Sequence, residues 1–188
     1  MLILILLWGI YFFLHSYMAS VSVKKRIINA FGSTQKSYRL AYNVFNIITL
    51  ILLIFLLLKT PSSLFYKGNP VLELIGILVL LLGVLIIVLA VKNYDLPAFF
   101  GFRNETNMAL QVKGIHKYVR HPLYSGTLLL FLGICIALPE TKNWILFLLM
   151  FIYILVGIKL EEKKLVTTFG DEYRSYQKKV KQLIPYLF

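Results

Sequence analysis

Two short polar clusters stand at the edges of long apolar segments, and their residue types could bind a small charged ligand. The first is Arg120-His121-Pro122-Leu123-Tyr124-Ser125-Gly126, where a basic stretch turns into an apolar one. The second is the pair Glu161-Glu162, which follows the next apolar run. Each of these apolar runs is long enough to enter a bilayer, where ionisable residues are rare and often functional. We therefore treat the two clusters as candidate parts of one site.

The first cluster predicts a helix start that could hold an anion. Proline is favoured at the first helical position, and the residue before it is pushed out of the α region. A helix should therefore begin at Pro122, with His121 as its cap residue and Tyr124 on the same side. The free N–H groups of that end favour a carboxylate or phosphate. A simpler reading, in which Arg120, His121 and Tyr124 only anchor the chain at the membrane surface, stays open.

The second cluster favours a cation. Adjacent residues on a helix point about 100° apart, so we expect one of Glu161 and Glu162 to face inward and the other to pair with a lysine of the tail. An inward carboxylate would suit an ammonium or sulfonium group, whereas the alternative is a solvated pair that ends the apolar run. S-adenosylmethionine carries a carboxylate, an amine and a sulfonium, so it is one candidate ligand among several. Aromatic faces could add cation–π attraction of ~0.5–2 kcal/mol, from Phe99, Phe100, Tyr118 and Tyr124.

The elements around these clusters look like membrane helices. The chain is 59% hydrophobic with a mean hydropathy of +0.78, and its apolar residues are concentrated in blocks. A transmembrane helix needs about 20 mostly apolar residues. We predict an all-α integral membrane fold with about five spans, the short fourth forming a hairpin with the fifth: Leu2–Met18, Ala41–Leu58, Val71–Val91, Leu123–Leu138 and Trp144–Leu160. The first segment lacks a positively charged start, so we expect a retained helix, not a signal peptide.

The distribution of charge predicts the orientation and argues against nucleic acid as a partner. The net charge is +12, yet the basic residues are not evenly spread. The polar segments after the first, third and fifth spans hold five, five and seven lysines and arginines, against two and one in the others. The positive-inside rule places the rich segments in the cytoplasm. The N-terminus is then outside, the C-terminus and both clusters are inside, and the partners are membrane lipids. The short chain without organelle signals favours a prokaryotic inner membrane.

The chain divides, on composition, into a scaffold over residues 1–92 and a working half over residues 93–188. The working half holds an interfacial loop, the last two spans and a cytosolic amphipathic helix with Tyr173, Tyr176 and Val180 on one side. A further amphipathic helix is predicted between Lys24 and Arg39. Gly76 and Gly83 could allow close helix packing. One cysteine and three histidines without metal-type spacing predict neither a disulfide nor a metal site.

The working half resembles a known family. The run from Gly114 to Gly126 is similar to the G-x-Y-x-x-x-R-H-P-x-Y-x-G motif of isoprenylcysteine carboxyl methyltransferases and related phospholipid methyltransferases. The C-terminal signature of that family resembles Glu161-Glu162-x-x-Leu165-x-x-x-Phe169-Gly170-x-x-Tyr173-x-x-Tyr176, followed by Val180 and Ile184-Pro185. The resemblance implies an integral membrane methyltransferase that uses S-adenosylmethionine and takes a lipophilic or small acceptor.

The resemblance also implies which residues line the cofactor. Carried over by motif position, these are Met108, Ala109, Leu110, Gln111, His116, His121, Tyr124, Glu161 and Glu162. Glu161 would bind the cofactor and Glu162 would support it. His116 stands where the family often has a tyrosine. No residue is assigned a catalytic role or a contact with the acceptor.

Two departures from the family pattern bear on the acceptor. The prenylcysteine enzymes carry an arginine for the substrate carboxylate four residues before the first glutamate, where this chain has Gly157. An upstream glutamine is replaced by Gly101. The missing arginine argues against a prenylcysteine carboxylate and leaves a small thiol or a phospholipid amine open. It also leaves an alternative, a non-enzymatic membrane protein of the same fold that binds a lipid or an assembly partner.

Overall fold

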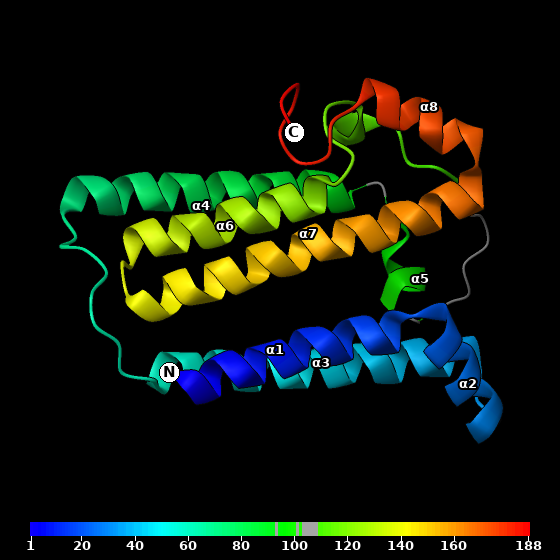
Figure 1. Cartoon of the computed structure of the whole chain (residues 1–188), viewed down its shortest axis with the longest axis horizontal. Helices are drawn as coiled ribbons and strands as arrows, with labels where there is room; N and C mark the ends of the chain where they lie inside the picture. The colour runs from blue at the N-terminus through cyan, green and yellow to red at the C-terminus, as the bar shows by residue number, and fades with distance from the viewer. Residues whose placement is uncertain (93, 101, 103–108) are drawn as a thin grey trace. The chain divides into compact units, whose positions relative to one another are not determined.

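The computed structural model describes residues 1–92, 94–100, 102 and 109–188, the side chains of residues 98 and 99 excepted, and every regular element within them is a helix. The chain forms two compact units. The first contains α1 (Leu2–Ala19), α2 (Val21–Phe31), α3 (Gln35–Lys59) and the short α5 (Leu96–Phe100). The second contains α4 (Pro70–Val91), the 3₁₀ turn η1 (Gly114–Lys117), α6 (Pro122–Ala137), α7 (Thr141–Phe169) and α8 (Asp171–Lys179) (Figure 1).

The predicted all-helical membrane fold is confirmed in its main features. Four described helices are long and apolar enough to cross a membrane: α1, α3, α4 and α7. The fifth apolar helix, α6, has 16 residues. A helix of that length rises only about 24 Å, less than the ~30 Å hydrocarbon core. The short fourth segment was expected to form a hairpin with the fifth, and α6 and α7 do pack together across a three-residue connection, from Leu138 to Glu140.

In the first unit, polar side chains join α1 to α3. The His15 Nδ1 and the Asn46 Oδ1 lie 2.9 Å apart, and the Asn46 amide donates to the Tyr42 carbonyl at 2.7 Å. The Tyr38 hydroxyl donates to the Met18 carbonyl at 2.6 Å. The predicted surface helix is α2, which begins after the cap residue Ser20 and ends at Gly32 with a positive φ of 59°. Glycine adopts that left-handed conformation without strain, so the helix ends there.

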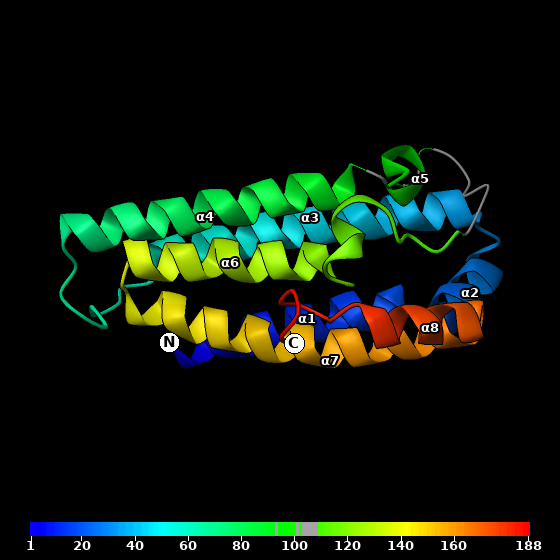
Figure 2. The ribbon, with the colours of Figure 1, turned by 90° about the horizontal axis from the view of Figure 1, so that it is seen from above.

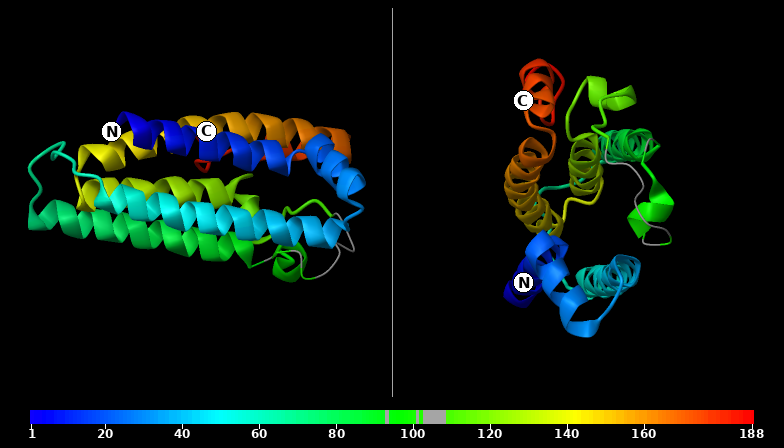
Figure 3. Two further views of the ribbon diagram at one scale, coloured as in Figure 1. Left: turned by 90° about the horizontal axis from the view of Figure 1, so that it is seen from below. Right: turned by 90° about the vertical axis from the view of Figure 1, so that its right-hand side faces the viewer.

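In the second unit, α6 lies between α4 and α7, as the end-on view shows (Figure 3). The helices α4 and α6 touch backbone to backbone, side by side along their length (Figure 2). A Cβ added at Gly83 would lie 2.4 Å from the Leu130 nitrogen, and one at Gly76 would lie 2.4 Å from the Ala137 nitrogen. Gly126 of the first motif packs from the other side, since its added Cβ would be 2.8 Å from the Gly83 oxygen. The predicted close packing at Gly76 and Gly83 is therefore confirmed, and it fixes the helix that carries the motif.

The end of the unit that carries the motif is shaped by two helix boundaries. The helix α6 begins at Pro122 with His121 at its cap position, as predicted, although the imidazole makes no capping hydrogen bond. The helix α7 ends at Phe169 because Gly170 takes a positive φ of 55°. There the chain turns into α8, whose Tyr173 is buried. The helix α4 belongs to the same compact unit as the later helices. The division into a scaffold before residue 93 and a working half after it is one of function, so it stays a prediction.

Candidate functional site

The two sequence clusters meet because the C-terminal segment pairs with the first motif. The Arg120 amide donates to the Lys181 carbonyl at 2.8 Å, and the His121 amide donates to the Gln182 carbonyl at 3.0 Å. One turn into α6, the Ser125 hydroxyl donates to the Leu183 carbonyl at 2.7 Å. These bonds hold the start of α6 against the chain that follows α8, which returns past the end of α7.

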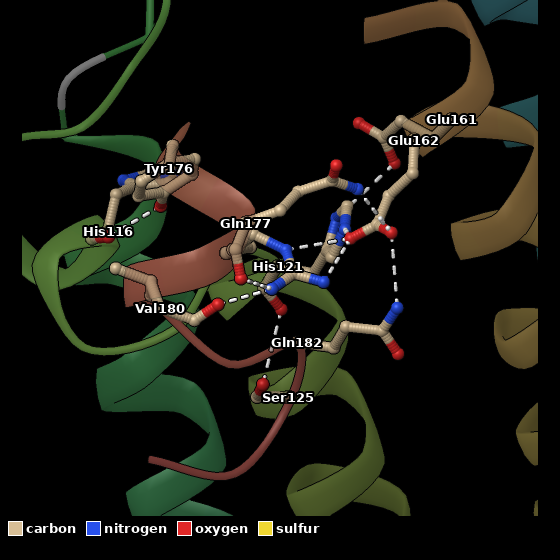
Figure 4. A network of polar contacts seen from close by, with 10 residues as sticks. His116, His121, Ser125, Glu161, Glu162, Tyr176, Gln177, Val180 and Gln182 are labelled. Atoms are coloured by element: carbon tan, nitrogen blue, oxygen red, sulfur yellow. Dashed lines mark hydrogen bonds and ion pairs between the residues drawn. The ribbon is translucent and has the colours of Figure 1, made fainter. Parts of the chain in front are cut away.

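Glu162 is the centre of a buried polar network (Figure 4). Its Oε1 accepts from the Arg120 guanidinium at 2.8 Å from Nε and 2.6 Å from Nη2, and it lies 3.1 Å from the His121 Nε2. Its Oε2 accepts from the side-chain amides of Gln177 at 3.0 Å and Gln182 at 3.2 Å. The exposed fraction of the Glu162 side chain is only 13%. Both carboxylate oxygens are therefore occupied by groups of the chain itself.

Arg120 links this network to α8. Its Nη1 donates to the carbonyls of Gln177 and Val180 at the end of that helix, and 8% of its side chain is exposed. We expected the outward glutamate to pair with a lysine of the tail, but among the described residues Glu161 forms no ion pair with a lysine. Arg120 is the partner of Glu162, because it reaches the carboxylate from the start of α6, whereas Lys163 and Lys164 are exposed on α7. The inward carboxylate is thus neutralised within the protein.

Glu161 has the opposite character. Its side chain is 43% exposed, and its Oε2 lies 3.7 Å from the His121 Nδ1. Among the described residues, no lysine or arginine forms an ion pair with it. The Glu161 side chain is therefore half-buried, and no lysine or arginine among the described residues neutralises its charge.

His121 stands between the two carboxylates. Its ring is buried and stacks on the Tyr124 ring, with the centroids 5.7 Å apart and the planes 26° apart. One nitrogen faces Glu162 and the other faces Glu161. The predicted sharing of one helix side by His121 and Tyr124 is confirmed. The network around Glu162 therefore sets the position of a ring that touches the available carboxylate.

His116 lies in η1, beside this group. It is buried, its Nε2 is 3.3 Å from the Tyr94 hydroxyl, and its backbone carbonyl accepts from the Tyr176 hydroxyl at 2.5 Å. Burial lowers the pKa of His116, so the imidazole is neutral at neutral pH. Burial also raises the pKa of Tyr94, with the charge of Glu161 adding to the effect. Burial raises the pKa of Tyr176 to about 12, so that phenol keeps the proton it donates.

The structure brings together five of the predicted residues and leaves the rest apart. His121 contacts Tyr124, Glu161 and Glu162, and His116 lies beside them in η1 (Figure 4). Ala109, Leu110 and Gln111 lie in the irregular segment before η1, where Ala109 is exposed and the other two are half-buried. Met108, Gly101 and the Phe99 side chain lie outside the described residues. Tyr118 is exposed, and Phe100 belongs to the other unit.

The sequence reasoning gave Arg120 no role beyond its place in the first cluster, and it did not assign Gln177, Gln182 or Tyr94 to the site. Arg120 was visible as the residue beside His121, and a carboxylate next to an apolar helix needs such a partner. The two glutamines gave no comparable signal, because their role depends on how the tail folds back over α7.

The fold and this network define a helical membrane protein with a polar site at one end of its helices, and comparison with known proteins identifies the family. The chain belongs to the NnrU protein family, whose sequence pattern matches residues 3–186. No solved structure matches it significantly.

Curated relatives match part of the chain. The chain is 49% identical over 75 residues to a methanethiol S-methyltransferase of Pseudomonas deceptionensis, which covers 39% of this chain and 27% of that protein. It is 45% identical over 73 residues to methanethiol S-methyltransferase 1 of Bradyrhizobium diazoefficiens, or 38% of this chain and 25% of that protein. It is 39% identical over 84 residues to a protein-S-isoprenylcysteine O-methyltransferase of Schizosaccharomyces pombe, and that match covers 44% of this chain and 35% of that protein. The matched part thus spans about a quarter to a third of these relatives, and the predicted resemblance is confirmed.

Proposed function

We propose that the chain is an integral membrane methyltransferase that uses S-adenosylmethionine. The observation that carries the proposal is the contrast between the two glutamates. Glu162 is fully occupied by Arg120, His121 and two glutamine amides, whereas Glu161 is half-exposed and unpaired by lysine or arginine among the described residues. The names of the relatives favour this reading over a non-enzymatic membrane protein.

The residues present fit the cofactor. The available Glu161 carboxylate suits the ammonium or the sulfonium of such a ligand, and the stacked rings of His121 and Tyr124 lie next to it. Aromatic faces near a cation add attraction of ~0.5–2 kcal/mol. When bound, S-adenosylmethionine would supply a methyl group made electrophilic by its sulfonium. In this proposal Glu161 and Tyr124 bind the cofactor, and Arg120 and Glu162 act as positioning residues that hold His121. Ala109, Leu110, Gln111 and His116 would line the same site.

The residues of the chain also bear on the acceptor. Gly157 lies one helical turn before Glu161, and a Cβ added there would meet nothing within 4 Å. The space beside Gly157 on α7 is therefore open, and Gly157 has no side chain to supply the cation that a carboxylate acceptor would need. We propose a small neutral thiol as the acceptor, in keeping with the methanethiol S-methyltransferases among the relatives. The enzyme's part is then to place the two reactants together and to exclude water.

We further propose that the chain spans the inner membrane of a prokaryote and that the site faces the cytoplasm. The basic residues near the site support this orientation. The segment between α4 and α6 and the tail after residue 158 carry twelve of the 20 lysines and arginines. Excess positive charge in short loops marks the cytoplasmic side.

A turnover assay tests the proposal. The purified chain in detergent would be given S-adenosylmethionine with methanethiol or with a prenylcysteine analogue, and methylated product would be followed by gas chromatography or mass spectrometry. We expect dimethyl sulfide from the thiol, little product from the carboxylate, and loss of turnover in Glu161→Gln. Glu172→Gln, which alters an exposed carboxylate on α8, is the matched control and should keep full activity. Turnover that survives Glu161→Gln would contradict the assigned role.

A further inference from the structure

A cavity at the end of α4 uses none of the residues of the Glu161–Glu162 network. Its volume is about 510 Å³, and it is lined by Leu89, Lys92, Gly114, Ile115 and Tyr118. A cavity of this size is within the range of small-molecule sites, about 300–1,000 Å³. Its lining comes from the last turn of α4 with the following Lys92, and from η1 with the following Tyr118, all within one compact unit.

The place of this cavity in the fold points to a lipid. The helix α4 is the most apolar of the four candidate membrane spans, and it ends at Val91, directly before Lys92. The cavity therefore lies where a membrane helix leaves the hydrocarbon. Leu89 and Ile115 offer apolar surface there, and the ring of Tyr118 is 56% exposed. Tyrosine is enriched at this depth because its ring meets both the hydrocarbon and the headgroup layer.

The charge of the cavity selects an anionic headgroup. Lys92 is the cation among its lining residues. Lys113 and Lys117, both exposed, flank the lining residues Gly114 and Ile115. The sequence from residue 109 to 120 contains no acidic residue. Because the C-terminal end of a helix such as α4 carries partial negative charge, an anion here must be bound by lysine side chains and not by the helix end.

We propose that this cavity binds an anionic phospholipid, with its phosphate at Lys92 and the adjoining part of an acyl chain against Leu89 and Ile115. The inference is independent of the proposed methyl transfer. A lysine near an anionic membrane surface is worth about 1 kcal/mol, or about fivefold in binding. A bound lipid would also attach η1, which carries His116, to the end of α4.

Lipid retention by the purified full chain tests the proposal. The protein would be exchanged into detergent that contains equal amounts of phosphatidylglycerol and phosphatidylcholine, and the bound lipids would be measured by native mass spectrometry. We expect the wild type to retain phosphatidylglycerol preferentially. Lys92→Gln should lower that preference about fivefold, and Lys92→Arg should restore it. Lys179→Gln, which changes an exposed lysine on α8, is the matched control and should behave as the wild type.

Two further arms separate the alternatives. An excess of soluble glycerol phosphate should leave the lipid in place, so displacement by it would mean that the apolar lining contributes nothing and would overturn the lipid assignment. Equal loss of preference in Lys92→Gln and Lys179→Gln would show general charge attraction and would equally overturn the site. Binding of S-adenosylmethionine by Lys92→Gln should match the wild type, because Lys92 is not part of the proposed cofactor site. The lipid result and the methyltransferase result can therefore fail separately.

Discussion

Replacing each of the two adjacent glutamates by glutamine should have opposite effects on stability and on ligand binding. Glu162→Gln removes the only carboxylate that neutralises Arg120 among the described residues, and only 8% of the Arg120 side chain is exposed. Removing one partner of a buried ion pair costs about 3–5 kcal/mol, because the other charge is left uncompensated. Glu161→Gln changes a side chain that is 43% exposed, where an ionic interaction is worth about 0–1 kcal/mol.

Thermal unfolding in detergent measures the difference. A loss of 1 kcal/mol lowers the melting temperature by about 2–4 °C in a chain of this size, so Glu162→Gln should melt about 6–20 °C lower. Glu161→Gln should melt within about 4 °C of the wild type. The double variant with Arg120→Met and Glu162→Met removes both charges, so it should lose less than the two single variants together. Equal melting of Glu161→Gln and Glu162→Gln would refute the division of roles between them.

The remaining predictions concern pH and packing. The pKa of His116 is lowered by burial, so the unfolded state takes up a proton as the pH falls below about 6.5 while the folded state stays neutral. This contribution to stability is present above that pH and is lost as the pH falls towards the folded pKa. His116→Gln should therefore flatten the fall in melting temperature between about pH 7 and pH 5, and an unchanged slope would count against a buried neutral ring. Gly83→Leu would place its Cβ 2.4 Å from the Leu130 nitrogen, so α4 and α6 must separate, with a loss of about 3 kcal/mol or more in an unfolding assay. Gly9→Leu is its control, since nothing lies within 4 Å of a Cβ at Gly9, and equal losses in the two would refute the close packing.

Local sequence rules predicted much of the fold. Pro122 marked the first residue of α6 because proline is tolerated only at a helix start, and Gly170 marked the end of α7 because it can adopt a positive φ. The apolar runs predicted the long helices, because a membrane span needs about 20 mostly apolar residues. The packing of α4 against α6 could not be predicted from either segment alone. It depends on Gly83 and Gly126, which meet only after the chain folds back.

The candidate site was predictable in its residue types but not in its pairing. The spacing of His121 and Tyr124 placed both on one side of α6, and their rings do stack. The sequence could not tell which glutamate faces inward, because that depends on the rotation of α7 about its axis. It also could not foresee the amides of Gln177 and Gln182 on Glu162, since these come from a tail that folds over the site.

The central claim is that Glu161 binds a cationic cofactor while Glu162 supports the site, and calorimetry tests it most directly. Wild type, Glu161→Gln and the control Glu172→Gln would be titrated with S-adenosylmethionine in the same detergent, after each is shown to be folded. We expect binding by the wild type and by Glu172→Gln, and at least tenfold weaker binding by Glu161→Gln, since a hydrogen-bonded charge contributes about 1.5–3 kcal/mol. Equal binding by Glu161→Gln and the wild type, or no binding by the folded wild type, would contradict the account.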